Sequence, residues 1–244
     1  MDRTTARDAF IRAYRDFIRA RYDYAHLHAH YQLPDSFDPE RVALFRDFFL
    51  DYFYPLPERR AVLDEAFAHL DDYIKQPGKL LALLMDSAGL IFKYGRHLPK
   101  ILKAGLGALQ SFRLASQFEE KLIDQVLALE LQAPFTPDEL QRLLASLDPT
   151  DVDAFIAHNE ELFGIIHDRE LVRKVIVIVD ELIAKMQRRP QVYSAAELAA
   201  LSFGRNLIKQ GNALFDQLTA AEQQTLIAWV IQIERDFWTK LLQQ

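Results

Sequence analysis

Residues 168–188 read DRELVRKVIVIVDELIAKMQR, and this stretch decides between an all-helical fold and a mixed one. Its centre, VIVIV at 175–179, is β-branched and is the strongest strand candidate in the chain. The flanking ELVRK and DELIAKM, however, continue an apolar pattern with helical spacing. The sequence therefore predicts a buried helix here, and with it an all-α fold.

Helix starts are marked clearly elsewhere in the chain. Thr136, Ser194 and Thr219 are each followed by Glu three positions later, which is the pattern of a capping box. Asp38 before Pro39 is typical of an N-cap with proline in the first turn. The predicted helices cover about residues 5–31, 39–54, 57–76, 79–97, 99–131, 137–146, 150–166, 168–188, 194–210 and 219–242.

These segments predict a single multi-helix, bundle-like domain of about nine or ten helices spanning residues 1–244. The loop at 132–137 is the best candidate boundary, and it would separate subclusters 1–133 and 134–244. Six residues make a short link, so we expect one domain with two subclusters rather than two separate domains.

Composition restricts the function classes. The net charge of −6 argues against nucleic-acid binding, because neutralising phosphates requires a basic surface. The absence of cysteine excludes disulfides, thiolate metal ligands and a cysteine nucleophile. We expect a cytoplasmic protein, since the N-terminal residues lack the uncharged segment of a secretory signal. No uncharged apolar run reaches the length of a transmembrane span.

Residues 78–109 differ most from the rest of the chain. They contain five of the eight glycines, and five basic residues against the single acid Asp86, a net charge of +4. Glycine inside a helix costs roughly 1 kcal/mol relative to alanine, so Gly89 suggests close approach by another backbone or by a ligand. From residue 96 onward, basic residues lie on one helical face and leucines on the other, as in an interfacial amphipathic helix.

The leading hypothesis is a non-catalytic helical protein that binds an apolar, anionic small molecule such as a fatty acid, or docks on lipid. Peripheral membrane contact through residues 78–109 belongs to the same hypothesis. The apolar wall would comprise Leu84, Leu90, Phe92, Leu102 and Leu106. The anionic group would meet Arg96, Lys100 and Lys103, while Gly89 and Asp86 complete the predicted site. The alternative is an ordinary amphipathic segment whose apolar side joins the core.

A second hypothesis is a metal-dependent helical enzyme. Asp23, His26 and His30 share one face of the first helix, and Glu65 with His69 forms a pair on the third. Imidazole and carboxylate ligands suit iron, manganese or zinc. The repeated Glu-x-x-His motif of helical di-metal proteins is missing, so the leading expectation is a protein without cofactor.

No sequence motif of a known catalytic machinery occurs. The chain has no G-x-S-x-G, phosphate loop, dinucleotide fingerprint or H-E-x-x-H. A scaffold or regulatory protein-interaction module without a small ligand therefore remains a third hypothesis. The sequence favours a protein that is not an enzyme.

Overall fold

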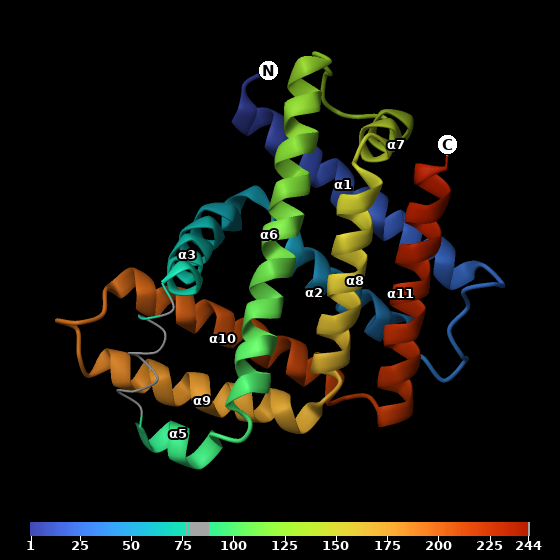
Figure 1. Cartoon of the computed structure of the whole chain (residues 1–244). Coiled ribbons are helices and arrows are strands. Elements are labelled where there is room, and N and C mark those ends of the chain that lie inside the picture. Colours follow the sequence, from blue (N-terminus) through green and yellow to red (C-terminus); the bar gives the residue numbers. More distant parts are fainter. Residues whose placement is uncertain (77, 79–87, 244) are drawn as a thin grey trace. The chain divides into compact units, whose positions relative to one another are not determined.

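The computed structural model describes residues 1–76, 78 and 88–243. These residues form helices and no strands, which confirms the all-α prediction (Figure 1). In chain order the described helices are α1 (Arg3–Leu27), α2 (Pro39–Phe53), α3 (Pro57–Lys75), α5 (Ala88–Tyr94), α6 (Leu98–Ala128), α7 (Pro137–Ala145), α8 (Pro149–Ile166), α9 (Arg169–Gln187), α10 (Ala195–Phe215) and α11 (Ala220–Leu242).

The predicted helix starts are confirmed. Thr136, Ser194 and Thr219 each accept a hydrogen bond from the backbone N–H three residues on, and the glutamate there accepts one from the cap's own N–H. Asp38 caps α2, with Pro39 in its first turn. The β-branched run at 175–179 lies inside α9, with Ile178 buried. Its helical neighbours on both sides thus outweigh the β propensity of five residues.

The chain divides into two compact units, and each is assembled from separate segments. Unit 1 comprises Met1–Glu58, Ser111–Glu160 and Leu218–Gln244, while unit 2 comprises Arg59–Gln110 and Glu161–Gln217. The division differs from the predicted subclusters 1–133 and 134–244, because residues 134–160 share a unit with the N-terminus. Three of the four dividing points fall inside α3, α6 and α8, where the sequence has no loop composition, and the fourth falls in the loop between α10 and α11.

Unit 1 is organised around the buried face of α1. Phe10, Ile11 and Ile18 recur at helical spacing there and are almost inaccessible to water. Aromatic rings of the unit pack against one another both stacked, as Phe10 does on Tyr14, and edge to face, as Tyr22 does against Trp229 at a centroid distance of 5.6 Å. Helix α7 packs against both α1 and α11. Large side chains from five other helical segments complete this core, among them Leu50, Ile123, Val126, Leu144, Val152, Ile233 and Trp238.

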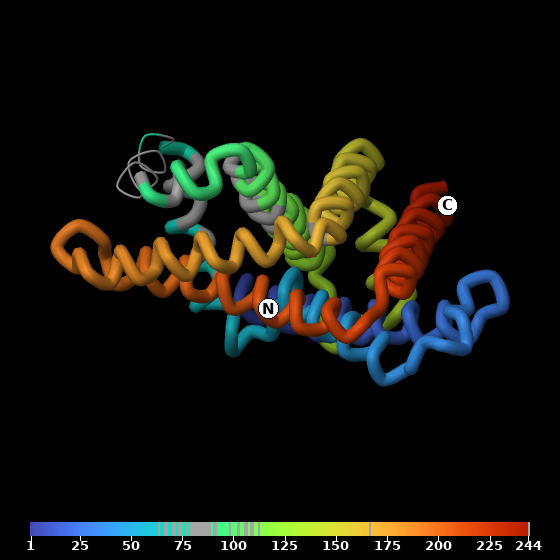
Figure 2. Tube along the Cα trace, turned by 90° about the horizontal axis from the view of Figure 1, so that it is seen from below, coloured from blue at the N-terminus to red at the C-terminus, as the bar shows by residue number. Residues whose placement is uncertain are grey.

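Unit 2 is built on the pair α9 and α10, which pack side by side (Figure 2). Leu171, Ile178, Leu182 and Met186 form one buried stripe of α9. Ile101, near the start of α6, completes this cluster. Tyr94, the last residue of α5, packs against it as a half-buried side chain.

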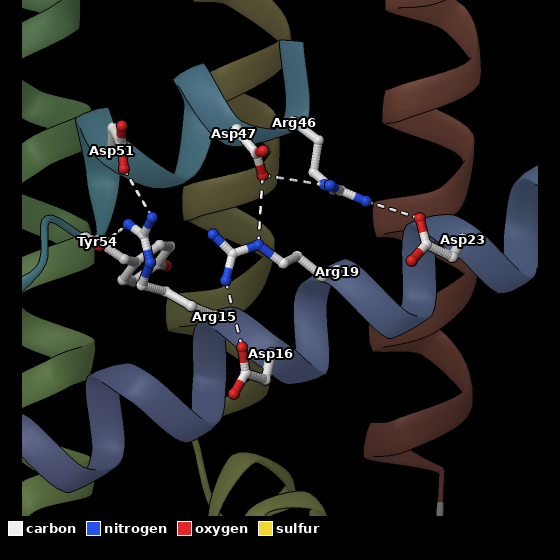
Figure 3. A network of polar contacts seen from close by, with 8 residues as sticks. All are labelled: Arg15, Asp16, Arg19, Asp23, Arg46, Asp47, Asp51 and Tyr54. Carbon is white, nitrogen blue, oxygen red and sulfur yellow. Dashed lines mark hydrogen bonds and ion pairs between the residues drawn. The ribbon is translucent and has the colours of Figure 1, made fainter. Parts of the chain in front are cut away.

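Arginine side chains connect α1 to α2 (Figure 3). Arg15 is buried, and its guanidinium donates to the carbonyl oxygen of Tyr54 and to Asp51, both at 2.6 Å. Arg19 donates to Asp47 at 3.3 Å, and Arg46 donates to Asp23 at 2.6 Å. Because Tyr54 caps the carboxyl end of α2, Arg15 supplies a hydrogen bond and a positive charge where that helix needs both.

We expect the buried Arg15 to contribute more to the free energy of unfolding than the more exposed Arg19. Replacing Arg15 by Met leaves the Tyr54 carbonyl without this donor inside the core, which should lower the free energy of unfolding by about 2 kcal/mol. Arg19→Met, the matched control one turn along the same helix, removes half-exposed pairs and should cost less than about 1 kcal/mol. Urea unfolding followed by circular dichroism measures both. Equal losses for the two variants would contradict this account.

Candidate functional site

The candidate site comprises α5, the turn after it and the first two turns of α6 (Figure 1). Helix α5 ends at Tyr94, and the N–H of His97 donates to the Tyr94 carbonyl oxygen at 2.7 Å. The N–H of Ile101 then donates to the His97 carbonyl oxygen at 3.0 Å as α6 begins. Gly95, Arg96 and His97 therefore form a tight, hydrogen-bonded turn between the two helices.

Phe92 is the most exposed of the large hydrophobic side chains that the structure describes. It is 96% exposed, although a buried phenylalanine would contribute roughly 1.5–3 kcal/mol to stability. The helix explains this orientation: two residues on an α-helix are separated by about 200°, so Phe92 and Tyr94 point in nearly opposite directions. Because Tyr94 packs against the core of unit 2, Phe92 faces water.

Basic side chains surround Phe92 in the sequence and are exposed like it. Arg96, Lys100 and Lys103 lie at helical spacing on the outer side of the turn and of α6. Ile101, between two of these lysines, points into the core of unit 2. This start of α6 is therefore amphipathic, with the predicted charged face toward water.

Glutamates from α8 and α9 neutralise part of this positive charge. The Nζ of Lys93 lies 3.5 Å from Glu181, and the Nζ of Lys103 lies 2.5 Å from Glu161. Both lysines are more than half exposed, so these pairs are weak. Within the described part of the chain, Arg96 and Lys100 form no ion pair with a carboxylate. These two cations are therefore available to an anionic partner.

His97 lies among the cations of this surface. Its Nε2 is 2.9 Å from the Nε of Arg96 and 3.2 Å from the Nζ of Lys174 on α9. Partial removal from water, and then the charges of Lys174 and Arg96, lower the pKa of His97 below its usual 6.5, although Glu170 acts in the opposite direction. Nε2 therefore accepts hydrogen bonds in a neutral ring at neutral pH. Sequence reasoning did not include His97 in the site, because Lys174 lies far away in the chain.

The other predicted ligand-binding residues have different outcomes. Leu84 and Asp86 lie outside the described residues, as do the side chains of Leu90, Leu102 and Leu106. Gly89 is exposed, and a methyl group placed on it would meet no described atom within 4 Å. Within the described part of the chain, close packing therefore does not account for this glycine, contrary to the expectation from its helical cost.

The candidate metal ligands belong to two different units. Asp23, His26 and His30 are in unit 1, whereas Glu65 and His69 are in unit 2. Asp23 is already engaged by Arg46. Among the described residues, no three histidine, aspartate or glutamate side chains gather closely enough to hold a metal ion.

Glu234 binds two ionisable side chains of α1 in unit 1. Glu234 accepts hydrogen bonds from Arg21 and from the Tyr22 hydroxyl, the latter at 2.9 Å. Burial raises the pKa of Tyr22 well above 10 and that of Tyr14 to about 12, so both hydroxyls stay protonated at neutral pH. These groups stabilise the core, and they are poorly suited to proton transfer near neutral pH.

No family model, no curated protein and no solved structure matches this chain. In the described part of the chain, none of the helices combines the length and the apolar character needed to cross a bilayer.

The pKa of His97 should reveal the charges around it. The pKa of His97 in the folded protein lies below 6.5. The stability that His97 contributes is therefore complete above pH 6.5, and it declines as the pH falls from 6.5 through this lowered pKa. Histidine proton signals in NMR should give a midpoint below 6.5. Lys174→Gln should raise that midpoint, because it removes a positive charge 3.2 Å from the ring.

Lys209→Gln is the control, since Lys209 pairs with Asp180 elsewhere in unit 2. It should leave the His97 midpoint unchanged. A wild-type midpoint above 6.5, or one that ignores Lys174→Gln, would show that the ring is not surrounded by these cations.

Proposed function

We propose that this protein docks reversibly on anionic lipid surfaces through Phe92, Arg96, Lys100 and the flanking lysines. The observation that carries the proposal is the exposure of Phe92, at 96%, in residues 88–109, where the described exposed charges are all positive. An aromatic side chain next to several cations is typical of peripheral segments that lie in the bilayer interface. The ring enters the acyl boundary while the cations remain among the phosphates.

The same exposure favours a bilayer over a closed pocket. Phe92 is the one residue of the predicted apolar wall whose side chain the structure describes, and it faces water. A side chain that lines an internal ligand cavity would instead be mostly buried. Docking on lipid is therefore the form of the original hypothesis that the described residues support best.

The expected affinity is modest. A lysine or arginine near an anionic membrane surface contributes about 1 kcal/mol, and burial of a phenylalanine ring roughly 1.5–3 kcal/mol. The two cations that form no ion pair among the described residues, together with one ring, then give about 4 kcal/mol, which corresponds to a dissociation constant of about 1 mM for lipid. Binding of this strength is reversible and sensitive to salt, because the cations are exposed.

Flotation with vesicles tests the proposal. We expect the full chain to float with phosphatidylcholine vesicles that contain phosphatidylserine, and to stay behind with phosphatidylcholine alone or at high salt. Phe92→Ala should reduce the bound fraction several-fold, because the ring no longer enters the bilayer. Leu129→Ala is the matched control, since Leu129 is also an exposed apolar residue, at 63%, but lies in unit 1.

The contribution of charge is tested separately. Arg96→Gln combined with Lys100→Gln should abolish the preference for phosphatidylserine, whereas Arg142→Gln with Lys240→Gln removes two exposed cations from unit 1 and should leave it intact. Equal binding to neutral and anionic vesicles, or equal effects of the two double variants, would overturn the proposal. Capture of a fatty acid without any vesicle binding would support a pocket instead.

A further inference from the structure

A pair of histidines lies at the carboxyl end of α1, in unit 1. His28 caps this helix, and its N–H donates to the Tyr24 carbonyl oxygen at 2.9 Å. The chain then turns back, because the N–H of Tyr31 donates to the His28 carbonyl oxygen at 2.9 Å. This turn brings the ring of His30 to a centroid distance of 4.9 Å from the ring of His28, with 41° between their planes.

That separation matches two imidazoles on one metal ion. With a metal–nitrogen distance of about 2.0–2.1 Å, each ring centre lies roughly 3.2 Å from the ion, and ligand angles between 90° and 110° place the centres about 4.5–5.2 Å apart. The observed 4.9 Å falls in this interval. Rotation of the rings about their side-chain bonds would direct one nitrogen of each toward a common point.

The surroundings favour a cation. The carboxyl end of a helix carries partial negative charge, and α1 is 25 residues long. The Tyr31 hydroxyl donates to Asp236 at 2.7 Å, which places a carboxylate behind the turn. Trp229 donates its indole N–H to the Tyr31 carbonyl oxygen, so the turn is attached to α11 by both hydrogen bonds. The backbone of the turn is thus anchored at Tyr31, next to His30.

The hydrogen bond that metal binding would displace is weak. The N–H of His30 approaches the Nδ1 of His28 at 3.4 Å, which is long for such a bond. Coordination through Nε2 moves the ring proton of His28 to Nδ1, and only this long contact is given up. His30 is exposed, so water can reach the ion and fill the remaining coordination positions.

We propose that His28 and His30 together bind a divalent transition-metal ion, with Cu²⁺ tightest and Zn²⁺ weaker. The site differs from the predicted Asp23–His26–His30 face, because Asp23 pairs with Arg46 and the turn brings His28 to His30. It has two protein ligands, which is consistent with the lack of any group of three among the described residues.

Titration of the untagged full chain with Cu²⁺, followed by calorimetry and electron paramagnetic resonance, tests this site. One equivalent should bind, with hyperfine structure from two imidazole nitrogens. His28→Gln and His30→Gln should each weaken binding at least tenfold, and circular dichroism should show that both variants remain folded. His26→Gln and His69→Gln, which remove ligands of the alternative arrangement, should leave the affinity unchanged.

Three results would overturn the proposal. These are the absence of stoichiometric Cu²⁺ binding, an affinity that survives the loss of both His28 and His30, and an equal loss in His26→Gln. The last result would assign the ion to the face predicted from the sequence. None of these outcomes depends on vesicle binding, since His28 and His30 lie in unit 1 and the lipid-docking residues in unit 2.

Discussion

Unit 1 depends on the burial of one face of α1 together with the arginines that this burial encloses. Phe10, Ile11 and Ile18 remove apolar surface from water, but Arg15 lies on the same face and is buried with them. Burying a guanidinium costs free energy that hydrogen bonds to its two terminal nitrogens offset, and the end of α2 lies where the Tyr54 carbonyl oxygen and Asp51 accept them. Hydrophobic burial drives the packing, and this hydrogen bond restricts how α2 can be placed against α1.

In unit 2, burial of one helix face likewise determines which side chains remain exposed. The core around α9 is completed by Ile101 and Tyr94, which hold the start of α6 and the end of α5 against it. Because Tyr94 is turned toward this core, helical geometry turns Phe92 toward water, where the nearby cations are also exposed. The proposed lipid-docking surface therefore follows from the partial burial of Tyr94, which leaves Phe92 on the exposed side of α5.

Local signals in the sequence were sufficient to predict the fold class. The capping boxes at Thr136, Ser194 and Thr219 depend on contacts across three residues, and the helix over 175–179 follows from its flanks. Such local signals could not predict contacts between segments that are distant in the sequence. Periodicity alone could not show that Arg15 meets Tyr54, that Lys174 meets His97, or that the units divide within α6. The spacing of Arg15 from Ile11 and Ile18 places a charge on an apolar helix face, and this pattern could have indicated a buried arginine.

The most direct test of the proposed lipid docking is whether the side chain at position 92 enters the bilayer. A Phe92→Trp variant serves as the probe, because the native Trp229 and Trp238 are buried in unit 1. With vesicles containing phosphatidylserine, the account predicts a blue-shifted emission and quenching by lipids brominated near the headgroup, both absent in a Leu129→Trp control. Unchanged emission from position 92 at saturating lipid, or equal quenching of the control, would contradict it.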